Sequence, residues 1–531
     1  MNGPADLHQS LHGLTVPGLL QRHALARPTA LALSAPSHGG GRHRLTYGQV
    51  VLRMEAMARS LWIRGVRPGQ RVALYLTNDA MREAVLTALG CYRLGAVVVP
   101  FNTRASPAET GDGLALVEPT HIVTTPDHAG RLARLWPAAR VMELGSDVPA
   151  GRQWPDPETT HDQAELPPLP NAEQPSAMLF TSGTTGSPKA VVHCHRSQLY
   201  CGYAIAGAIG LTGHDIYQGA WPVYTSSVLN LACMGAWVAG AAVALEPASA
   251  DNAQRLRLIE SEGTTVYHGV PSVLGFLVKE YAKGGYDLGG VRRIGYGGAA
   301  MPADLVMRLD QLFPHADQIH IWGMTETGPA GSYLPPWLAT RKPGCIGGPQ
   351  AGCQLKVVDA AGAPAPQGEP GELLFHGPSS AKGYFRNAAA TAETFVDGWV
   401  RTGDIARCDA DGHLHFLDRK KDLINRGGTK IASVMVENVL HRFPGVIEAA
   451  VIAVPHPDLG EDIAACIATA LPTPDIEALR EYCRGQLADY QVPRHWYVFE
   501  QLPKNPMGKV LKRDLREMVR HMPEGGTGAP A

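Results

Sequence analysis

The sequence predicts an α/β fold with a large N-terminal body and a smaller C-terminal part, and three observations support this. From Leu45 to Pro100, helical patterns alternate with short apolar runs, which is the rhythm of a parallel sheet covered by helices. The same alternation returns between residues 241 and 298. After a charged run from Asp418 to Asp422, the rest of the chain has a strand and helix pattern of its own.

The individual elements follow from periodicity and from the residues that bound each run. Residues 147–175 are rich in Pro, Asp and Glu without periodicity, which indicates a surface connection inside the body. In the body we expect helices over 50–65, 80–95 and 254–262, strands over 71–76, 96–100, 176–180, 264–271 and 292–298, and a buried helix running into a strand over 231–245.

The domain boundary is predicted after a short strand, His413 to Leu417. The two domains would then span residues 1–417 and 418–531. A strand over 449–455 and a helix over 476–489 belong to the second. Taken alone, the charged run Asp418 to Asp422 is typical of a solvated turn.

Composition excludes some functions. With 47 basic and 49 acidic residues in 531, the formal net charge is -2, too weak a field to attract nucleic acid or an anionic membrane, so a small-molecule substrate is favoured. Nine scattered cysteines without a CxxC pair, and an N-terminus without signal-peptide features, predict a cytoplasmic protein. The longest apolar stretch is shorter than the ~20 residues of a membrane-spanning helix.

The strongest local signal is TSGTTGSPK, Thr181 to Lys189, directly after an apolar run. Small residues let the backbone wrap tightly, hydroxyl and amide groups can donate to phosphate oxygens, and Lys189 adds positive charge. The spacing is not that of a Walker loop, because Pro188 and Ala190 stand where a glycine and a hydroxyl are required. Such a run on its own is often only a flexible turn.

Four more motifs accompany this loop: IWGMTETG (321–328), GWVRTGD (398–404), DRKKDLINRGG (418–428) and PKNPMGKVLKRDLR (503–516). In this order they resemble the adenylate-forming superfamily of acyl-CoA synthetases, adenylation domains and luciferases. The resemblance implies a large N-terminal domain of stacked mixed sheets with helices, and a smaller, mobile α+β C-terminal domain. It also implies that a carboxylic acid is activated with ATP and Mg²⁺ as an acyl-adenylate and passed to coenzyme A.

Within the nucleotide site, the resemblance implies that Trp322 stacks on adenine and that His320 reads its amino group. Thr325 would donate to the α-phosphate and Glu326 would hold Mg²⁺ together with Thr184. Asp404 and Arg419 would bind the ribose. The implied ATP and AMP contacts are Thr181, Ser182, Gly183, Thr184, Thr185, Gly186, Lys189, Gly298, Ala299, Ala300, His320, Ile321, Trp322, Gly323, Thr325, Asp404 and Arg419.

Lys509 is expected, with Thr325 and Glu326, to be catalytic. Charge grows on the oxygens around the α-phosphorus as pyrophosphate leaves, and a lysine stabilises it there. Because the lysine loop would block the thiol, the family rotates its C-terminal domain; Lys421 resembles the hinge, and Gly427 and Gly428 would line the pantetheine channel.

The chain departs from the family at two places. Ser433 and Met435 stand where a proline and a glutamate are usual, and Thr225 stands where many members have histidine. The acyl pocket implied by the resemblance, Tyr224, Thr225, Ser226 and Gly297, offers no obvious cation, which favours an apolar or aromatic monocarboxylic acid. His193 and His195 flank Cys194, but without further ligands nearby we expect them to be structural.

Several alternatives stay open. The enzyme could load an acyl carrier protein, or form only the thioester from an adenylate made elsewhere, which the change around Met435 leaves possible. A different class would be a silent nucleotide- or acyl-binding protein that keeps the fold. Such a binder would have no need of Lys509. The identity of the acid, the oligomeric state and the pathway are not predicted.

Overall fold

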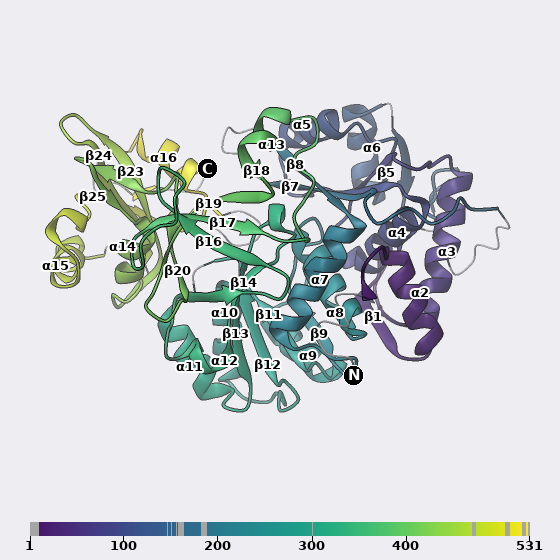
Figure 1. The fold of residues 1–531 in the computed structure, drawn as a ribbon, viewed down its shortest axis with the longest axis horizontal. Coiled ribbons are helices and arrows are strands. Elements are labelled where there is room, and N and C mark those ends of the chain that lie inside the picture. Colours follow the sequence, from purple (N-terminus) through teal and green to yellow (C-terminus); the bar gives the residue numbers. More distant parts are fainter. Residues whose placement is uncertain are drawn as a thin grey trace. The chain divides into compact units, whose positions relative to one another are not determined.

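The structure is a computed structural model that describes residues 10–137, 139–145, 147–149, 151–155, 157, 164–181, 188–299, 301–469, 474–504, 510–522 and 527–528. It divides into two compact units (Figure 1). Unit 1 comprises residues 1–355 and 375–401, and unit 2 comprises 356–374 and 402–531.

The larger sheet of unit 1 runs in the order β2-β1-β10-β9-β11-β12-β13-β14-β15. Neighbours from β1 to β13 are parallel, whereas β2, β14 and β15 join antiparallel. The bounds are β1 Leu31–Pro36, β2 Arg42–Thr46, β9 Ile216–Gly219, β10 Ala242–Leu245, β11 Val266–Gly269, β12 Arg293–Gly297, β13 Asp317–Gly323, β14 Gly331–Leu334 and β15 Cys345–Pro349.

The second sheet of unit 1 runs in the order β6-β5-β3-β4-β7-β8 and is parallel except for the hairpin β7–β8. Its strands are short and apolar, as expected where both faces are covered. The bounds are β3 Arg71–Tyr75, β4 Val97–Pro100, β5 His121–Thr124, β6 Arg140–Glu143, β7 Pro175–Thr181 and β8 Lys189–Cys194.

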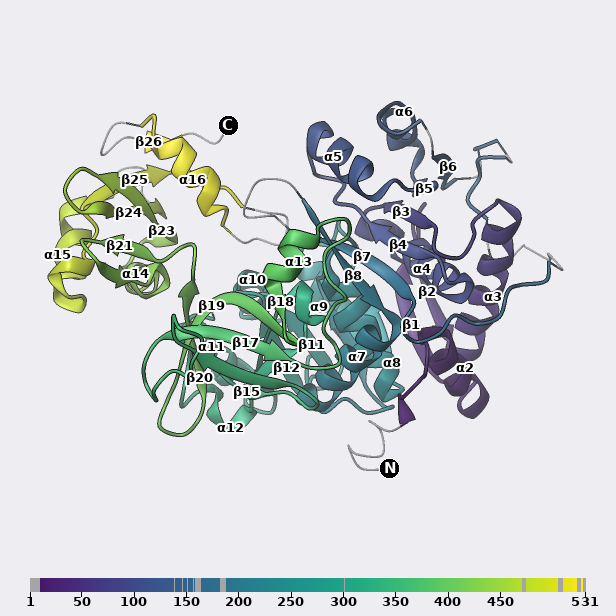
Figure 2. The ribbon, with the colours of Figure 1, turned by 45° about the horizontal axis from the view of Figure 1, so that its top comes forward.

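Helix α4 connects the two sheets, because it contacts β1 of the first and β4 of the second (Figure 2). Nearly all of its residues are buried, as a helix packed on both sides requires. The helices and the short strand β18 of unit 1 are α2 Val16–Ala26, α3 Tyr47–Ile63, η1 Asn78–Ala80, α4 Met81–Leu94, α5 Pro107–Val117, α6 Pro126–Leu135, α7 His195–Ile209, the π-helix η2 Ser227–Cys233, α8 Met234–Ala239, α9 Asn252–Glu262, α10 Pro271–Tyr281, α11 Ala303–Leu312, η3 Thr325–Thr327, α12 Pro336–Ala339, α13 Ala388–Thr394 and β18 Phe395–Val396.

Unit 2 holds most of the strands β16, β17, β19 and β20, and a sheet in the order β22-β21-β24-β25-β26 with β23 beside β24. Residues alternate along β23, so that Val451 packs with α14 and α15 whereas Ile452 packs with α16 on the other face. The bounds are β16 Gln354–Val358, β17 Gly371–His376, β19 Trp399–Cys408, β20 Leu414–Arg419, β21 Ile424–Arg426, β22 Thr429–Ile431, α14 Ser433–Leu440, β23 Val446–His456, β24 Gly460–Thr469, α15 Ile476–Gln486, η4 Asp489–Gln491, β25 His495–Phe499, α16 Lys512–Val519 and β26 Thr527–Gly528.

The predicted α/β class is confirmed, and so is the pairing of a large N-terminal unit with a smaller C-terminal one. The predicted helix and strand over 231–245 correspond to η2, α8 and β10. The boundary after residue 417 stays a prediction. Among the helices that the structure describes, none is long and apolar enough to cross a membrane.

Candidate functional site

The hairpin β7–β8 frames the predicted phosphate loop. Thr181 ends β7 and Lys189 begins β8, and the two residues pair directly across the hairpin. The Lys189 ammonium nitrogen lies 4.9 Å from the ring centre of Tyr384, within the range of a cation–π contact. The loop residues between them, Ser182, Gly183, Thr184, Thr185 and Gly186, lie outside the described part of the chain.

The turn η3 carries Thr325 and the buried Glu326, and backbone contacts on two sides fix it. His193 donates from Nε2 to the Thr325 carbonyl oxygen over 2.9 Å. The Ala381 amide donates to the Glu326 carbonyl oxygen, also over 2.9 Å. Because β8 carries His193, the strand that leaves the phosphate loop also supports the turn that presents Thr325 and Glu326.

One oxygen of the Glu326 carboxylate is held in place. The Tyr384 hydroxyl donates to Oε1 over 2.8 Å. Burial, and next the Glu326 charge, raise the pKa of Tyr384, so this hydroxyl keeps its proton and remains a donor. A carboxylate oriented by a hydrogen bond to one of its oxygens fits a hard cation such as Mg²⁺.

Sequence analysis did not identify Tyr384. The available signal was a single Gly383–Tyr384 pair, too short to stand out between the longer motifs. The structure places residues 382–385 along β8. The backbone amide of Lys382 donates to the Val192 carbonyl oxygen, and the backbone amide of Phe385 donates to the Ala190 carbonyl oxygen. This pairing brings Tyr384 between Glu326 and Lys189.

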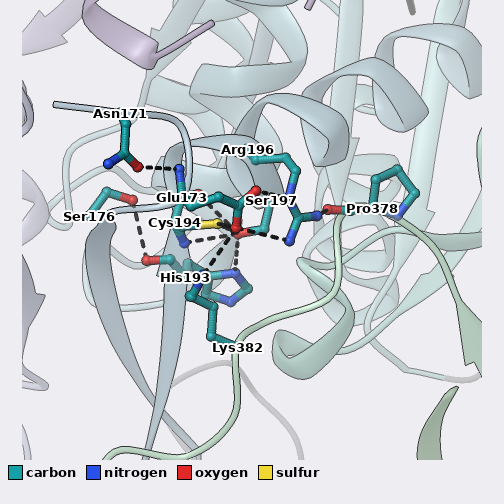
Figure 3. Close-up of polar contacts among 9 residues, drawn as sticks. All are labelled: Asn171, Glu173, Ser176, His193, Cys194, Arg196, Ser197, Pro378 and Lys382. Atoms are coloured by element: carbon teal, nitrogen blue, oxygen red, sulfur yellow. Dashed lines mark hydrogen bonds and ion pairs between the residues drawn. The ribbon is translucent and has the colours of Figure 1, made fainter. Parts of the chain in front are cut away.

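A polar cluster anchors the same segment (Figure 3). Glu173 lies between two cations, 2.5 Å from Arg196 Nε and 3.0 Å from Lys382 Nζ. Arg196, at the start of α7, also donates to the Pro378 carbonyl oxygen. Exposed ion pairs stabilise little one by one, but here they join Glu173, which precedes β7, to α7 and to residues 378–382.

The predicted adenine wall is formed by the ends of β12 and β13. Ile321 pairs with Gly297, and Trp322, on the next position of β13, is 9% exposed. Gly297 and Gly323 admit no side chain, because a Cβ atom would lie 2.1 Å from the carbonyl oxygens of Ile321 and Pro329 respectively. Gly298 has a left-handed φ of +78° and leads into the exposed Ala299; Ala300 lies outside the described residues.

The tautomer of His320 follows from its contacts. Nδ1 lies 3.0 Å from the Cys345 carbonyl oxygen, which can only accept, so Nδ1 carries the proton. Burial lowers the pKa of His320 to about 4, so the ring is neutral at physiological pH. Nε2 is therefore an acceptor, which suits the amino group of adenine.

In unit 2, Asp404 and Arg419 meet as the sequence predicts for a ribose site. They pair across β19 and β20, and Arg419 Nε lies 2.6 Å from Asp404 Oδ1. Asp404 is 1% exposed and Arg419 lies at the surface end of the pair. The role of the pair in ribose binding stays a prediction.

The residues predicted to form the hinge and the coenzyme A channel have simple local structures. Lys421 is exposed in the turn after β20. Gly427 and Gly428 have φ values of +59° and +88° and form the two-residue turn of hairpin β21–β22, a conformation that favours glycine. The turn accounts for both glycines, and their place in a channel stays a prediction.

Ser433 belongs to a buried polar cluster of unit 2. Its amide and hydroxyl both donate to Asp418 Oδ2 over 2.6 Å, and Lys512 Nζ donates to its Oγ over 2.5 Å. Lys512 also pairs with Glu437 at 2.6 Å. Asp418 is therefore not part of a solvated turn: it is 2% exposed, and burial raises its pKa against the opposing charge of Lys512.

The predicted acyl segment leads into η2. The Tyr224 hydroxyl is buried without a hydrogen-bond partner among the described residues, and burial raises the pKa of Tyr224 to about 12. The charge of Arg104 opposes this rise, so a cation that sequence analysis missed acts on Tyr224. Thr225 donates to the Pro222 carbonyl and Ser226 accepts from Asn230. π-Helices such as η2 often occur at functional sites.

His193 and His195 are core residues. β8 ends at Cys194, so His193 belongs to the strand and His195 is the first residue of α7. Neither belongs to the one group of potential metal ligands found in the described part of the chain, which is the hairpin group Asp409, Asp411 and His413. Lys509 lies outside the described residues.

The buried histidines of unit 1 predict destabilisation by acid. Burial lowers the pKa of His193 and His320 to about 4 and that of His195 and His268 to about 3. Below pH 6.5 the unfolded chain binds protons that the folded chain does not, so the free energy of unfolding decreases as the pH is lowered. Between pH 7.5 and pH 5 each of these histidines should lower it by about 2 kcal/mol. Urea unfolding at pH 7.5 and 5.0 measures this loss.

A matched pair of variants isolates the contribution of His195 to this loss of stability. Neither nitrogen of His195 has a hydrogen-bond partner among the described residues, so His195→Leu should recover about 2 kcal/mol of the loss at pH 5. His315→Gln, at an exposed position, should recover none. Equal unfolding free energies of the wild type at both pH values would contradict the prediction.

Comparisons with known proteins identify the family of the chain. A family model described as AMP-binding enzyme matches residues 20–385, and one described as AMP-binding enzyme C-terminal domain matches residues 435–509. The chain is 34% identical to a feruloyl-CoA synthase from Amycolatopsis sp over 93% of its length and 97% of the relative. It is 32% identical to a fatty acid–[acyl-carrier-protein] ligase from Streptomyces coeruleorubidus over 93% of its length and 94% of the relative.

A solved structure extends the similarity to a complex with an intermediate. The o-succinylbenzoate-CoA synthetase of Bacillus subtilis, in complex with its acyl-adenylate, superimposes with a TM-score of 0.84 at 26% identity. The match covers 95% of this chain and 98% of the other.

Proposed function

The chain belongs to the AMP-binding enzyme family and is an AMP-forming acyl-CoA ligase that uses ATP, Mg²⁺ and coenzyme A, and we propose that its acid is an apolar or aromatic monocarboxylic acid. The observation that carries the proposal is the acyl segment, residues 221–230, which contains no charged side chain. The Tyr224 hydroxyl within it is buried and lacks a partner among the described residues. An aromatic acid with a polar ring substituent, as feruloyl implies for the relative, would match this lining.

The first half-reaction is assigned residue by residue. A carboxylate oxygen attacks the α-phosphorus and pyrophosphate leaves, giving the acyl-adenylate. We assign donation to the α-phosphate to Thr325, the metal carboxylate to Glu326 and charge stabilisation to Lys509. Bound Mg²⁺ supplies neutralisation of the triphosphate charge. Asp404 and Arg419 hold the ribose, and His320 and Trp322 the adenine.

In the second half-reaction the thiol sulfur attacks the acyl carbon and AMP leaves with its phosphate oxygen. Asp404 and Arg419 continue to hold the ribose of AMP while the thioester forms. We assign Lys421 as the hinge about which residues 418–531 turn between the halves, and Gly427 and Gly428 to the pantetheine channel. A cytoplasmic location, supported by nine free thiols, is part of this proposal.

Delivery to a carrier-protein thiol is the second candidate. The relative named as an acyl-carrier-protein ligase supports it, since the same two half-reactions serve either thiol. A thioester-forming half alone is a weaker candidate because the sequence keeps Glu326 and Lys509, to which we assign roles in adenylation. A silent nucleotide- or acyl-binding protein would have no need of Lys509.

The test is pyrophosphate release from ATP and Mg²⁺ with a panel of aliphatic, aromatic and dicarboxylic acids, with coenzyme A or a carrier protein. We expect release with apolar or aromatic monocarboxylic acids, and mass spectrometry should detect the acyl-CoA. The dicarboxylic acids are the critical comparison, because the positive charge of Arg104 acts on Tyr224 and would attract a second carboxylate. A dicarboxylic acid that is preferred by the wild type but not by Arg104→Met would overturn the proposed substrate class, and thioester formed only on the carrier would assign the second candidate.

A further inference from the structure

Tyr384 contacts two groups assigned to the phosphate end of the nucleotide site. Its hydroxyl donates to Glu326 Oε1 over 2.8 Å, and its ring centre lies 4.9 Å from Lys189 Nζ. One side chain thus contacts both groups: the hydroxyl proton binds the carboxylate, and the electron-rich face of the ring attracts the ammonium group.

The tyrosine is itself fixed on several sides. Its amide donates to Thr391 Oγ1 over 3.0 Å, its ring packs edge-on against Phe395 at 5.8 Å, and the residue is 9% exposed. A side chain held by its backbone, ring and oxygen can restrict the rotamer of a partner, which a mobile one cannot.

The restriction matters most at Glu326. A glutamate side chain on a short turn has three rotatable torsions, and a metal ligand must hold its oxygen within a few tenths of an ångström. The hydrogen bond fixes Oε1, which leaves Oε2 as the oxygen for the metal. Partners that orient a ligating carboxylate typically change metal affinity ten- to hundredfold when they are removed.

We propose that Tyr384 is a positioning residue for the Mg²⁺ site: it orients Glu326 through its hydroxyl and keeps Lys189 beside the same phosphates through its ring. The inference rests on the assignment of Glu326 as the metal carboxylate. Tyr384 acts through Glu326, so its effect appears in the Mg²⁺ dependence of nucleotide binding.

The test measures binding rather than turnover. Calorimetric titrations with α,β-methylene-ATP over a range of Mg²⁺ concentrations are compared with titrations of AMP without metal. Tyr384→Phe keeps the ring and removes the hydroxyl, and we expect the Mg²⁺-dependent affinity to fall ten- to hundredfold while the AMP affinity is unchanged. Glu326→Gln should weaken it at least as much.

Two further variants separate positioning from stability. The double variant Tyr384→Phe/Glu326→Gln should bind no more weakly than Glu326→Gln alone, because the hydroxyl has then lost its target. Tyr47→Phe removes another buried hydroxyl, which donates to the Ala241 carbonyl, and should leave the Mg²⁺ dependence at its wild-type value.

The outcomes are distinct. A wild-type Mg²⁺ dependence in Tyr384→Phe, together with a weakened one in Glu326→Gln, overturns the role of Tyr384. Additive losses in the double variant overturn it as well. An unchanged Mg²⁺ dependence in Glu326→Gln would remove the metal assignment on which the inference rests, while acid-dependent pyrophosphate release would still identify the enzyme as a ligase.

Discussion

Replacing Lys509 by alanine should lower acyl-adenylate formation by about two to three orders of magnitude, the cost typical of removing one group that stabilises developing charge. Thioester formation from a supplied acyl-adenylate should stay close to the wild-type rate, because no pyrophosphate leaves in that step. The two half-reactions are measured separately, as acid-dependent pyrophosphate release and as acyl-CoA formed from synthetic adenylate.

Lys504 provides the matched control for this prediction. It lies in the same motif but pairs with Glu448, so Lys504→Ala should affect neither half-reaction by more than a few-fold. An equal loss of both half-reactions in Lys509→Ala would contradict a role specific to adenylation. An undiminished rate of adenylation in Lys509→Ala would overturn the catalytic role of Lys509.

The second large effect is expected for Asp404→Ala. A hydrogen bond to a charged group is worth about 1.5 to 3 kcal/mol, and the carboxylate is assigned two ribose hydroxyls, so AMP affinity should fall by about a hundredfold or more. Arg419 keeps 33% of its side chain exposed, so its guanidinium can turn to water and the fold should tolerate the change.

Deoxynucleotides make this test specific. The wild type should bind 2′-deoxy-AMP more weakly than AMP, whereas Asp404→Ala should bind both alike. Asp411→Asn changes an exposed carboxylate in the hairpin that joins β19 and β20 and serves as the control. If Asp404→Ala still discriminated between the two nucleotides, the ribose would be held by other groups.

Sequence was most informative where a motif and a local pattern coincided. The helix expected over 80–95 is α4, Met81–Leu94, because apolar periodicity and a final glycine define it locally. Asp404 and Arg419 were expected to act together from two separate motifs, and the antiparallel register of β19 and β20 places them opposite each other.

Sequence was least informative where contacts are distant along the chain. Glu326 and Tyr384 meet through the pairing of residues 382–385 with β8, and no periodicity reports such a contact. Asp418 lies in a charged run that is usually solvated, yet Ser433 and Lys512 supply the partners that permit its burial. The influence of Arg104 on Tyr224 is likewise visible only after folding.

The Ser433 cluster also has a mechanical consequence. It joins the end of β20 to the first turn of α16, and Arg516 pairs with Asp422 at 2.8 Å one turn further along that helix. These two contacts therefore hold the segment that contains Lys421 against helix α16. A small movement near the axis of a rotating domain becomes a larger displacement far from that axis. Misplacement of a catalytic group by about 1 Å can cost a hundredfold in rate. Ser433 thus stiffens the junction between the end of β20 and the start of α16.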